Sequence, residues 1–298
     1  MISVFVGAVE GSARALAALC AAGHAPALVV TLPPDRSGAH SDFADLGPLA
    51  ARHGIPVHRT ARTAAPETLD AIRALAPDVV LVIGWSQLVG EAFRAIPRLG
   101  VLGFHPAALP RMRGRAVIPW HIIAGQHQGG ATLFWIDEGT DSGPIAAQTV
   151  FPIDPDRITA RALYDRAVAE MVALLPPLMD RLAAGERPAT PQDDGQATIC
   201  ARRRPVDGII DWRRPAAEIE RLVRAVGPPY PGALTGGPDA PITVTAARLH
   251  PRDGRFIGLA GQVQDIRDGV LTVMCGDGRC LDLTEWTAAR PPARHAML

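Results

Sequence analysis

Hydrophobic positions fall into short runs through the first half of the chain, separated by stretches with helical spacing. The runs that predict strands cover residues 2–7, 27–32, 55–58, 78–84, 99–104, 131–136 and 144–151. The stretches that predict helices cover residues 12–22, 44–53, 66–75 and 159–182. Alternation of buried strands and amphipathic helices is typical of a doubly wound α/β domain with a mostly parallel sheet. We therefore predict one such domain over residues 1–184.

The pattern changes after this domain. Residues 185–204 are polar, contain proline and are rich in arginine, which is typical of a linker between domains. Beyond the linker, the pattern predicts one helix over 216–226 and short strands over 242–249, 261–264, 270–275 and 280–283. Short strands separated by turns predict a small β-rich, barrel-like domain over residues 205–298.

Composition points to no highly charged partner and to no membrane. The 30 basic residues, all of them arginine, are balanced by 30 acidic residues, so no global field attracts nucleic acid or anionic lipid. A membrane-spanning helix needs about 18 consecutive apolar residues, and no apolar run is that long. The first residues also lack a signal-peptide pattern. We therefore expect a cytoplasmic protein. The four cysteines lack metal-ligand spacing and are either buried hydrophobic residues or redox or nucleophilic groups.

The candidate chemistry lies between residues 103 and 148. His105 follows the strand predicted over 99–104, at the edge where open α/β sheets bind ligands. Asp141 occupies a glycine-flanked polar turn after a later strand. A histidine and a carboxylate at one sheet edge are the minimum for proton transfer to a reacting amine. An isolated histidine at such an edge is also compatible with a structural role.

The order of short motifs around these two residues is distinctive. Along the chain it reads His105-Pro106, Leu109-Pro110, Arg113-Gly114, Gly130-Ala131-Thr132 and Asp137-Glu138-Gly139-Thr140-Asp141-Ser142-Gly143. The second half continues with Asp207, Asp211-Trp212, Arg224 and Pro229-Tyr230-Pro231-Gly232. This order resembles that of the folate-dependent formyltransferases over most of the chain, and only in outline near the carboxyl terminus.

The resemblance implies a catalytic set of an asparagine, a histidine and an aspartate. His105 and Asp141 stand at the histidine and aspartate positions, whereas the asparagine position is Gly103. The family asparagine donates a hydrogen bond to the formyl oxygen, and losing one such donor costs about 10²–10³ in rate. Three explanations stay open: a substitute donor, a stronger nucleophile, or a binding protein without turnover. The substitute donor would be a water molecule or one of Ser86, Gln87 and His121.

The resemblance also implies the formyl donor and its binding site. The donor is 10-formyltetrahydrofolate, and the resemblance implies no metal ion. The residues implied to line the pterin site are Ile83, Gly84, Trp85, Ser86, Gln87, Leu88, Ile136, Asp137 and Gly139. His105 would stabilise the oxyanion or move the amine proton. Asp141 would keep His105 correctly protonated or accept the proton itself.

These motifs leave the acceptor amine open. From residue 205 onward, 11 arginines are matched by 11 acidic residues, and the segment 33–43 has one arginine against two aspartates. We therefore expect nucleic acid to be an unlikely partner, because phosphate contacts dominate its binding. We predict a small-molecule amine, in first place a nucleotide-linked amino sugar. The side chains predicted to hold it are Arg113, Arg115, Arg204 and Tyr230, each of which is also compatible with a solvent-facing or packing role.

Other acceptors remain open. An amino acid or a hydroxylamine, such as N-hydroxyornithine, is the second small-molecule class, because a stronger nucleophile would tolerate the missing asparagine. Transfer to charged initiator tRNA, hydrolysis of the formyl donor, and folate binding without turnover are the remaining alternatives. A homodimer formed through the C-terminal domain is a further hypothesis.

Overall fold

The computed structural model describes residues 1–39, 42–237, 240–251 and 254–298. The chain divides into two compact units. The first unit comprises Met1–Val117, Gln128–Pro152 and Tyr164–Cys200, and the second comprises Ile118–His127, Ile153–Leu163 and Ala201–Leu298. The boundaries predicted from the sequence, 1–184, 185–204 and 205–298, stay a proposal. They differ in two respects: residues 118–127 and 153–163 belong to the second unit, and residues 185–200 of the predicted linker belong to the first.

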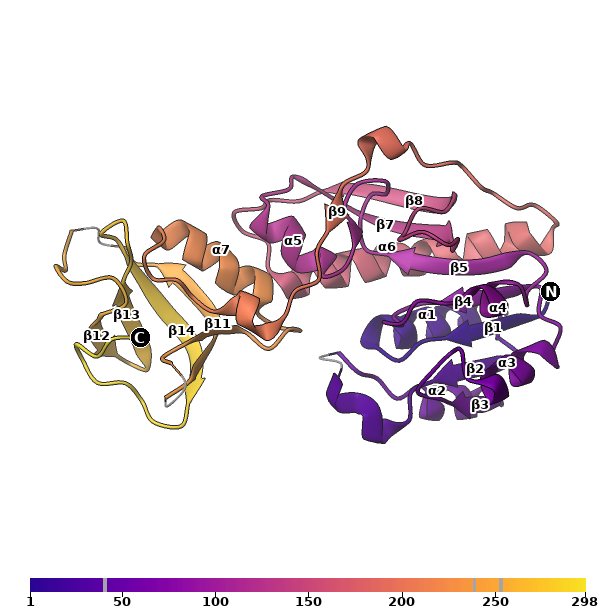
Figure 1. The fold of residues 1–298 in the computed structure, drawn as a ribbon, viewed down its shortest axis with the longest axis horizontal. Coiled ribbons are helices and arrows are strands. Elements are labelled where there is room, and N and C mark those ends of the chain that lie inside the picture. Colours follow the sequence, from indigo (N-terminus) through magenta and orange to yellow (C-terminus); the bar gives the residue numbers. More distant parts are fainter. Residues whose placement is uncertain (40–41, 238–239, 252–253) are drawn as a thin grey trace. The chain divides into compact units, whose positions relative to one another are not determined.

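A seven-stranded sheet forms the centre of the first unit, with its strands in the order β3, β2, β1, β4, β5, β7 and β8 (Figure 1). Their bounds are β1 Ser3–Val6, β2 Leu28–Thr31, β3 Val57–Arg59, β4 Val79–Val82, β5 Gly100–His105, β7 Gln128–Trp135 and β8 Ile145–Pro152. All pairs from β3 to β5 are parallel, whereas β7 runs antiparallel to both of its neighbours. The prediction of a mostly parallel α/β sheet is confirmed.

The central strands have continuous apolar sequences because both faces of the sheet are covered. Every residue of β1, β2 and β4 is buried. Successive side chains point to opposite faces, so Phe5 lies in one core cluster while Val4 and Val6 lie in the other. The first cluster also takes residues from α1 (Glu10–Ala21), α2 (Gly47–Arg52) and α6 (Ala160–Ala183), and the second from α3 (Pro66–Arg73) and α4 (Glu91–Arg94).

Several short elements are not visible in the hydrophobic pattern. They are β6 (Arg113–Gly114), β9 (Ile199–Cys200), β10 (Ala233–Thr235), the helix α4, and the 3₁₀ helices η1 (Pro34–Ala39), η2 (Asp194–Gln196) and η3 (Pro205–Gly208). Each is too short for a helical or strand period to show. The helix α5 (Val117–Ile123) contains the Ile-Pro-Trp sequence that follows the Arg113-Gly114 motif.

A five-stranded antiparallel sheet forms the centre of the second unit, in the order β10, β11, β14, β13 and β12 (Figure 1). The bounds of the four longer strands are β11 Ile242–Leu249, β12 Val263–Arg267, β13 Val270–Met274 and β14 Cys280–Ala288. Helix α7 (Ala216–Val226) packs on β11 and buries Ile219 and Val223. The prediction of a β-rich second domain is confirmed, and its strands pair as one sheet.

The segment predicted as a linker, residues 185–204, folds onto the first unit over much of its length. The indole nitrogen of Trp135 donates a 2.7 Å hydrogen bond to the carbonyl of Pro188. Ile145 and Thr190 exchange two backbone hydrogen bonds of 2.8 Å. Further along, β9 pairs in parallel with β6. Such contacts use backbone and polar groups, so the hydrophobic pattern of the sequence does not reveal them.

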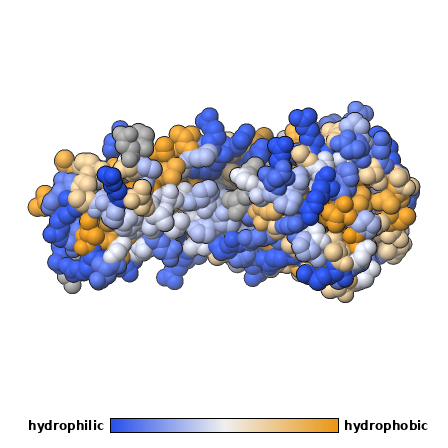
Figure 2. Space-filling view, turned by 90° about the horizontal axis from the view of Figure 1, so that it is seen from below, coloured by the Kyte–Doolittle hydropathy of each residue, from blue (hydrophilic) through white to orange (hydrophobic). Residues whose placement is uncertain are grey.

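The surface carries scattered hydrophobic residues. On the face seen in Figure 2, hydrophobic residues lie among hydrophilic ones. Within the described residues, the most exposed large hydrophobic side chains are Ile257, Leu88 and Ile199. No helix in the described part of the chain is long and apolar enough to cross a membrane.

Candidate active site

His105 is the last residue of β5, and its side chain is buried. Its Nε2 lies 2.7 Å from the carbonyl oxygen of Met112, and its Nδ1 lies 3.5 Å from Oδ2 of Asp141. Because a carbonyl oxygen only accepts hydrogen bonds, Nε2 carries a proton in this contact. Both ring nitrogens therefore face oxygen acceptors, and a cationic ring can donate to both. The structure brings His105 and Asp141 together, as the sequence predicted.

Asp141 reaches His105 from a turn with an unusual backbone. Its φ is 52°, in the left-handed region that residues other than glycine rarely adopt. Its Oδ2 accepts a 2.8 Å hydrogen bond from the backbone nitrogen of Gly114. Met112 and Ala116, on either side of Gly114, also have positive φ, 62° and 53°. Such positions persist only where surrounding contacts hold them, and they cluster at functional sites.

The loop after His105 is held by polar contacts from β7 and β8. Thr132, fully buried on β7, donates a 2.6 Å hydrogen bond to the carbonyl of Ala107. The side-chain nitrogen of Gln148 on β8 donates to the carbonyl of Leu109 and to Thr132 Oγ1, both at 2.9 Å. Thr132 belongs to the family motif, whereas Gln148 was not among the predicted residues. No local sequence signal identifies Gln148, since its partners lie on other strands and loops.

Gly103, at the family asparagine position, is surrounded by apolar side chains. It is buried on β5 and pairs in register with Phe134. A Cβ atom at Gly103 would lie 3.0 Å from Cγ1 of Ile136 and 3.0 Å from Cε1 of Phe134. The space that a larger side chain would enter is therefore already occupied by these two residues.

The three predicted substitutes for the missing donor come from different parts of the chain. Ser86 and Gln87 are exposed in the loop after β4, and the side-chain nitrogen of Gln87 donates to the carbonyl of Ala61. His121 is buried on α5, which belongs to the second unit. None of the three is thereby established as the replacement for the family asparagine.

The loop predicted to bind the pterin begins inside the core and ends in solvent. The carbonyl of Ile83 accepts a 2.6 Å hydrogen bond from the hydroxyl of Ser12. Gly84 has a φ of 67°, and a Cβ there would lie 2.2 Å from a methyl group of Val9, so this position requires glycine. Trp85 is half-buried against the core. The later members of the loop, Ser86, Gln87 and Leu88, are exposed.

The second predicted pterin segment shapes the turn that carries Asp141. Oδ1 of Asp137 accepts hydrogen bonds from the backbone nitrogen of Gly139 at 3.0 Å and from the hydroxyl of Ser142 at 2.8 Å. A Cβ at Gly143 would lie 1.7 Å from the carbonyl oxygen of Trp135, so only glycine fits there. Asp137 and Gly139 thus have a clear structural role in this turn, and their contact with a pterin stays a prediction.

The four residues predicted to bind the acceptor come from both units. Arg113 is buried, and its guanidinium contacts Gln192 and Asp194, which accounts for this side chain without a substrate. Arg115 is exposed. Arg204 and Tyr230 belong to the second unit, the first exposed and the second half-buried.

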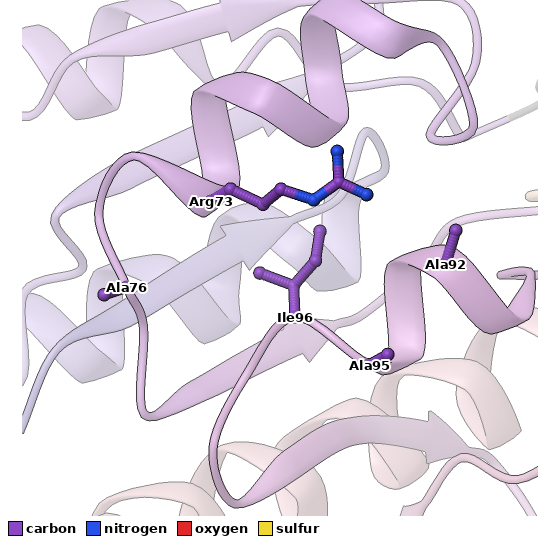
Figure 3. A pocket seen from close by; sticks show the side chains of 5 residues that line it. All are labelled: Arg73, Ala76, Ala92, Ala95 and Ile96. Carbon is purple, nitrogen blue, oxygen red and sulfur yellow. The ribbon is translucent and has the colours of Figure 1, made fainter.

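A shallow pocket of 370 Å³ opens elsewhere on the first unit (Figure 3). Its lining residues are Arg73, Ala76, Ala92, Ala95 and Ile96. Ala76 and Ile96 precede the amino ends of β4 and β5, whereas His105 stands at the carboxyl end of β5. Arg73 is paired with Asp70. The pocket holds no predicted catalytic residue, and His105 stands at the opposite edge of the sheet.

Two family models match the chain. The model described as "Formyl transferase" matches residues 5–178, and the model described as "Formyl transferase, C-terminal domain" matches residues 203–293. Together they span both regions in which the ordered motifs were found.

Relatives with substantial identity carry the name methionyl-tRNA formyltransferase. The relative from Symbiobacterium thermophilum is 33% identical over 280 residues, which cover 93% of this chain and 85% of the relative. The relative from Halorhodospira halophila is 36% identical over 284 residues, which cover 94% of this chain and 89% of the relative. The prediction that nucleic acid is an unlikely partner is not supported by these relatives.

Solved structures share the fold of both units. An N-formyltransferase from Helicobacter canadensis aligns with a TM-score of 0.67 and 19% identity, over 95% of this chain and 99% of its own. HypX from Aquifex aeolicus aligns with a TM-score of 0.68 and 17% identity, over 97% of this chain and 44% of its own. Likeness at this identity shows the fold alone, but the family models and the relatives show more. The chain belongs to the formyl transferase family.

Proposed function

We propose that this formyl transferase moves a formyl group from 10-formyltetrahydrofolate to the primary amine of a small molecule. The observation that carries the proposal is the contact between His105 and Asp141, whose Nδ1 and Oδ2 atoms are 3.5 Å apart. An imidazole and a carboxylate in contact can together take a proton from an attacking amine and return it to a leaving nitrogen. The two side chains also occupy the family positions for this task.

The loop after β4 suits the pterin ring of the donor. Trp85 offers a half-buried aromatic surface, and its Nε1 is buried without a hydrogen-bond partner in the described part of the chain. A buried donor normally has a partner, and an acceptor atom of the pterin would supply one. When bound, the donor supplies an electrophilic formyl carbon. The neighbours from Aquifex aeolicus and Helicobacter canadensis, crystallised with tetrahydrofolic acid and folinic acid, support this assignment.

His105 and Asp141 have different tasks in this proposal. Nε2 of His105 is committed to the carbonyl of Met112, so Nδ1 is the nitrogen left for the reacting atoms. When Nδ1 carries a proton as well, it donates to the formyl oxygen and stabilises the negative charge that builds up there. The side chain of Asp141 is 22% exposed, so an amine can reach its carboxylate. Asp141 orients the imidazole and accepts the proton of the attacking amine. This proton passes to the folate nitrogen as the bond between that nitrogen and the formyl carbon breaks.

Gly103 bears on the reactivity of the acceptor. Ile136 and Phe134 occupy the space beside Gly103, so no amide donor stands at the family asparagine position. The missing hydrogen bond to the formyl oxygen costs about 10²–10³ in rate unless another group replaces it. A strong nucleophile, such as a hydroxylamine, offsets part of this loss and is therefore one of the acceptors to test.

A nucleotide-linked amino sugar is the acceptor that we favour among small molecules. The second unit offers an exposed guanidinium, Arg204, and an aromatic ring, Tyr230, which match a diphosphate and a base in chemistry. The neighbour from Helicobacter canadensis was crystallised with dTDP-3-aminofucose. Balanced charge after residue 205 favours a small acceptor over a nucleic acid.

Methionyl-tRNA is the second candidate acceptor. The observation that favours it is the 33–36% identity to relatives named methionyl-tRNA formyltransferase, over more than nine-tenths of this chain. The balanced charge of the chain and its sequence relatives thus favour different acceptors, and an activity assay decides between them.

The assay mixes the purified protein with 10-formyltetrahydrofolate and one amine at a time, and follows the release of tetrahydrofolate. The panel holds UDP-, dTDP- and GDP-linked amino sugars, N-hydroxyornithine, charged initiator tRNA and a control without amine. Release with one small amine alone would support the main proposal. Release with tRNA alone would establish the second candidate. Release without any amine would make the enzyme a hydrolase, and no release under any condition would contradict transfer altogether.

A further inference from the structure

The segment of residues 190–200 contacts Asp141 directly, and it contacts Met112, the hydrogen-bond partner of His105. Its Gln192 donates through Nε2 to the carbonyl oxygens of Asp141 and Gly143, at 2.8 Å and 2.7 Å. These two carbonyls belong to the turn in which Asp141 has a φ of 52°. A single side-chain amide thus ties together the two ends of the turn, where the left-handed backbone needs external support.

The amide of Gln192 is oriented from its other side. Its Oε1 accepts hydrogen bonds from Nε and Nη2 of Arg113, at 3.1 Å and 2.8 Å. Nη2 of Arg113 also contacts Oδ1 of Asp194 at 2.8 Å. Because Arg113 can only donate, the oxygen of the amide must face Arg113 and the nitrogen must face the turn. Arg113 therefore sets the direction in which Gln192 donates.

The same segment holds the other partners of the pair. Gly114, whose backbone nitrogen binds the carboxylate of Asp141, pairs with Cys200 of β9. A Cβ at Gly114 would lie 2.5 Å from the carbonyl oxygen of Cys200, so the two backbones are in close contact. Met112, whose carbonyl accepts from His105, donates through its backbone nitrogen to Oγ1 of Thr198 at 2.8 Å.

We infer that Gln192 is a positioning residue for Asp141, oriented by Arg113, and that Thr198 and Cys200 support the neighbouring loop of Met112 and Gly114. This inference rests on the proposed function. Gln192 does not touch the reacting atoms in this assignment. Gln192 keeps the carboxylate of Asp141 at the distance and angle at which this carboxylate can orient His105 and accept a proton from the amine.

Three variants separate positioning from simple packing. Gln192→Ala removes both sets of hydrogen bonds. Gln192→Glu keeps the volume and the contact with Arg113, but turns an acceptor oxygen towards the two carbonyls of the turn. Gln196→Ala is the matched control, because Gln196 is an exposed glutamine of the same segment whose side chain contacts Asp193.

The measurements are kcat and KM with the amine accepted in the panel, binding of tetrahydrofolate, and the melting temperature. We expect both Gln192 variants to lower kcat by about 10–10²-fold, since small misplacements of catalytic groups have effects of this size. The KM for the donor and the binding of tetrahydrofolate should stay at the wild-type values. Gln196→Ala should match the wild type in every measurement.

Two results would overturn the inference while the wild type remains active. One is a wild-type kcat in Gln192→Glu, which would show that only packing matters. The other is a loss of activity in Gln192→Ala that merely follows the loss of folded protein in the melting curve. A wild type that is inactive on the whole panel would instead contradict the proposed function, and the inference with it.

Discussion

At the scale of single residues, the candidate site consists of one buried imidazole between two oxygen acceptors. The ring of His105 contacts the carbonyl of Met112 on one side and faces the carboxylate of Asp141 on the other. Fixing one nitrogen leaves the other for chemistry, which is the arrangement that a proton-transfer group requires. Asp141 adopts an unfavourable left-handed backbone conformation, and this conformation brings its carboxylate to Nδ1 of His105.

Removing either member of the pair should therefore abolish most of the activity. We expect His105→Ala and Asp141→Asn each to lower kcat by at least about 10²-fold, the contribution of a positioned acid or base. Binding of tetrahydrofolate, followed by fluorescence quenching, should persist. His53→Ala, at an exposed histidine that ends α2, serves as the control. Near-normal rates in both site variants would remove the pair from the mechanism.

Burial also controls the reactivity of Cys275 in the second unit. Loss of hydration, followed by the nearby charge of Asp277, raises the pKa of its thiol to about 12. A raised pKa keeps the thiol neutral near pH 8, and only the thiolate is nucleophilic. We expect iodoacetamide at pH 8 to spare Cys275 in the native protein and to alkylate it after unfolding in urea. Mass spectrometry of the peptides checks this, and rapid native labelling would contradict it.

At the scale of elements, the strand β7 and the loop after His105 are in backbone contact. A Cβ at Gly130 on β7 would lie 2.4 Å from the backbone nitrogen of Ala108. Together with the hydrogen bond from Thr132 to the carbonyl of Ala107, this close approach fixes the position of the loop relative to β7. The position of His105 thus depends on the packing of two elements that are distant in sequence.

Adding one methyl group at this contact should disturb both stability and activity. We expect Gly130→Ala to lower the free energy of unfolding by about 1–3 kcal/mol, because the neighbouring backbone cannot yield like a flexible side chain. The rate of formyl transfer should fall as well, since the His105 loop has to shift. Gly90→Ala is the control, since a Cβ there meets no atom within 4 Å and its φ is −72°. Urea unfolding that shows equal stability for both variants would contradict the close contact.

At the scale of the whole molecule, the charges of the chain are balanced. The 30 arginines and 30 acidic residues leave no net charge, and the part after residue 205 is balanced as well. Proteins that bind nucleic acid gain most of their affinity by neutralising phosphates with basic side chains. This chain has no excess of basic residues for that purpose.

We therefore expect transfer to the preferred amine to depend little on ionic strength. The measurement is kcat/KM between about 50 and 300 mM salt. Over a comparable range of salt, the affinity of binding dominated by phosphate contacts falls by about 10³–10⁵-fold. A steep loss of kcat/KM with salt would indicate contacts with many phosphates, as in a nucleic acid, and not with a single diphosphate. Found with charged initiator tRNA as the substrate, it would favour the second candidate acceptor.

The longer strands and helices were predictable because their signals are local. Continuous apolar runs identify β1, β2 and β4, and the long amphipathic stretch identifies α6, since burial on both faces of a sheet or on one face of a helix imposes a visible period. The ordered motifs around His105 and Asp141 likewise identified the family, which the family models confirm. The sequence by itself thus determined the fold class and the family, and it singled out His105 and Asp141, which the structure brings within 3.5 Å of each other as the candidate pair.

The remainder of the site depends on contacts between residues distant in sequence. Gln192 is 51 residues from Asp141 and 79 from Arg113, and the sequence predicted a linker for the first and substrate binding for the last. Hydrogen bonds between polar side chains of this kind produce no repeating pattern in the sequence. Only the tertiary structure therefore decided that Arg113 orients Gln192, and that Ile136 and Phe134 occupy the space beside Gly103. The reason is that hydrophobic periodicity records which face is buried, whereas the partner of a polar group is set by how the elements pack.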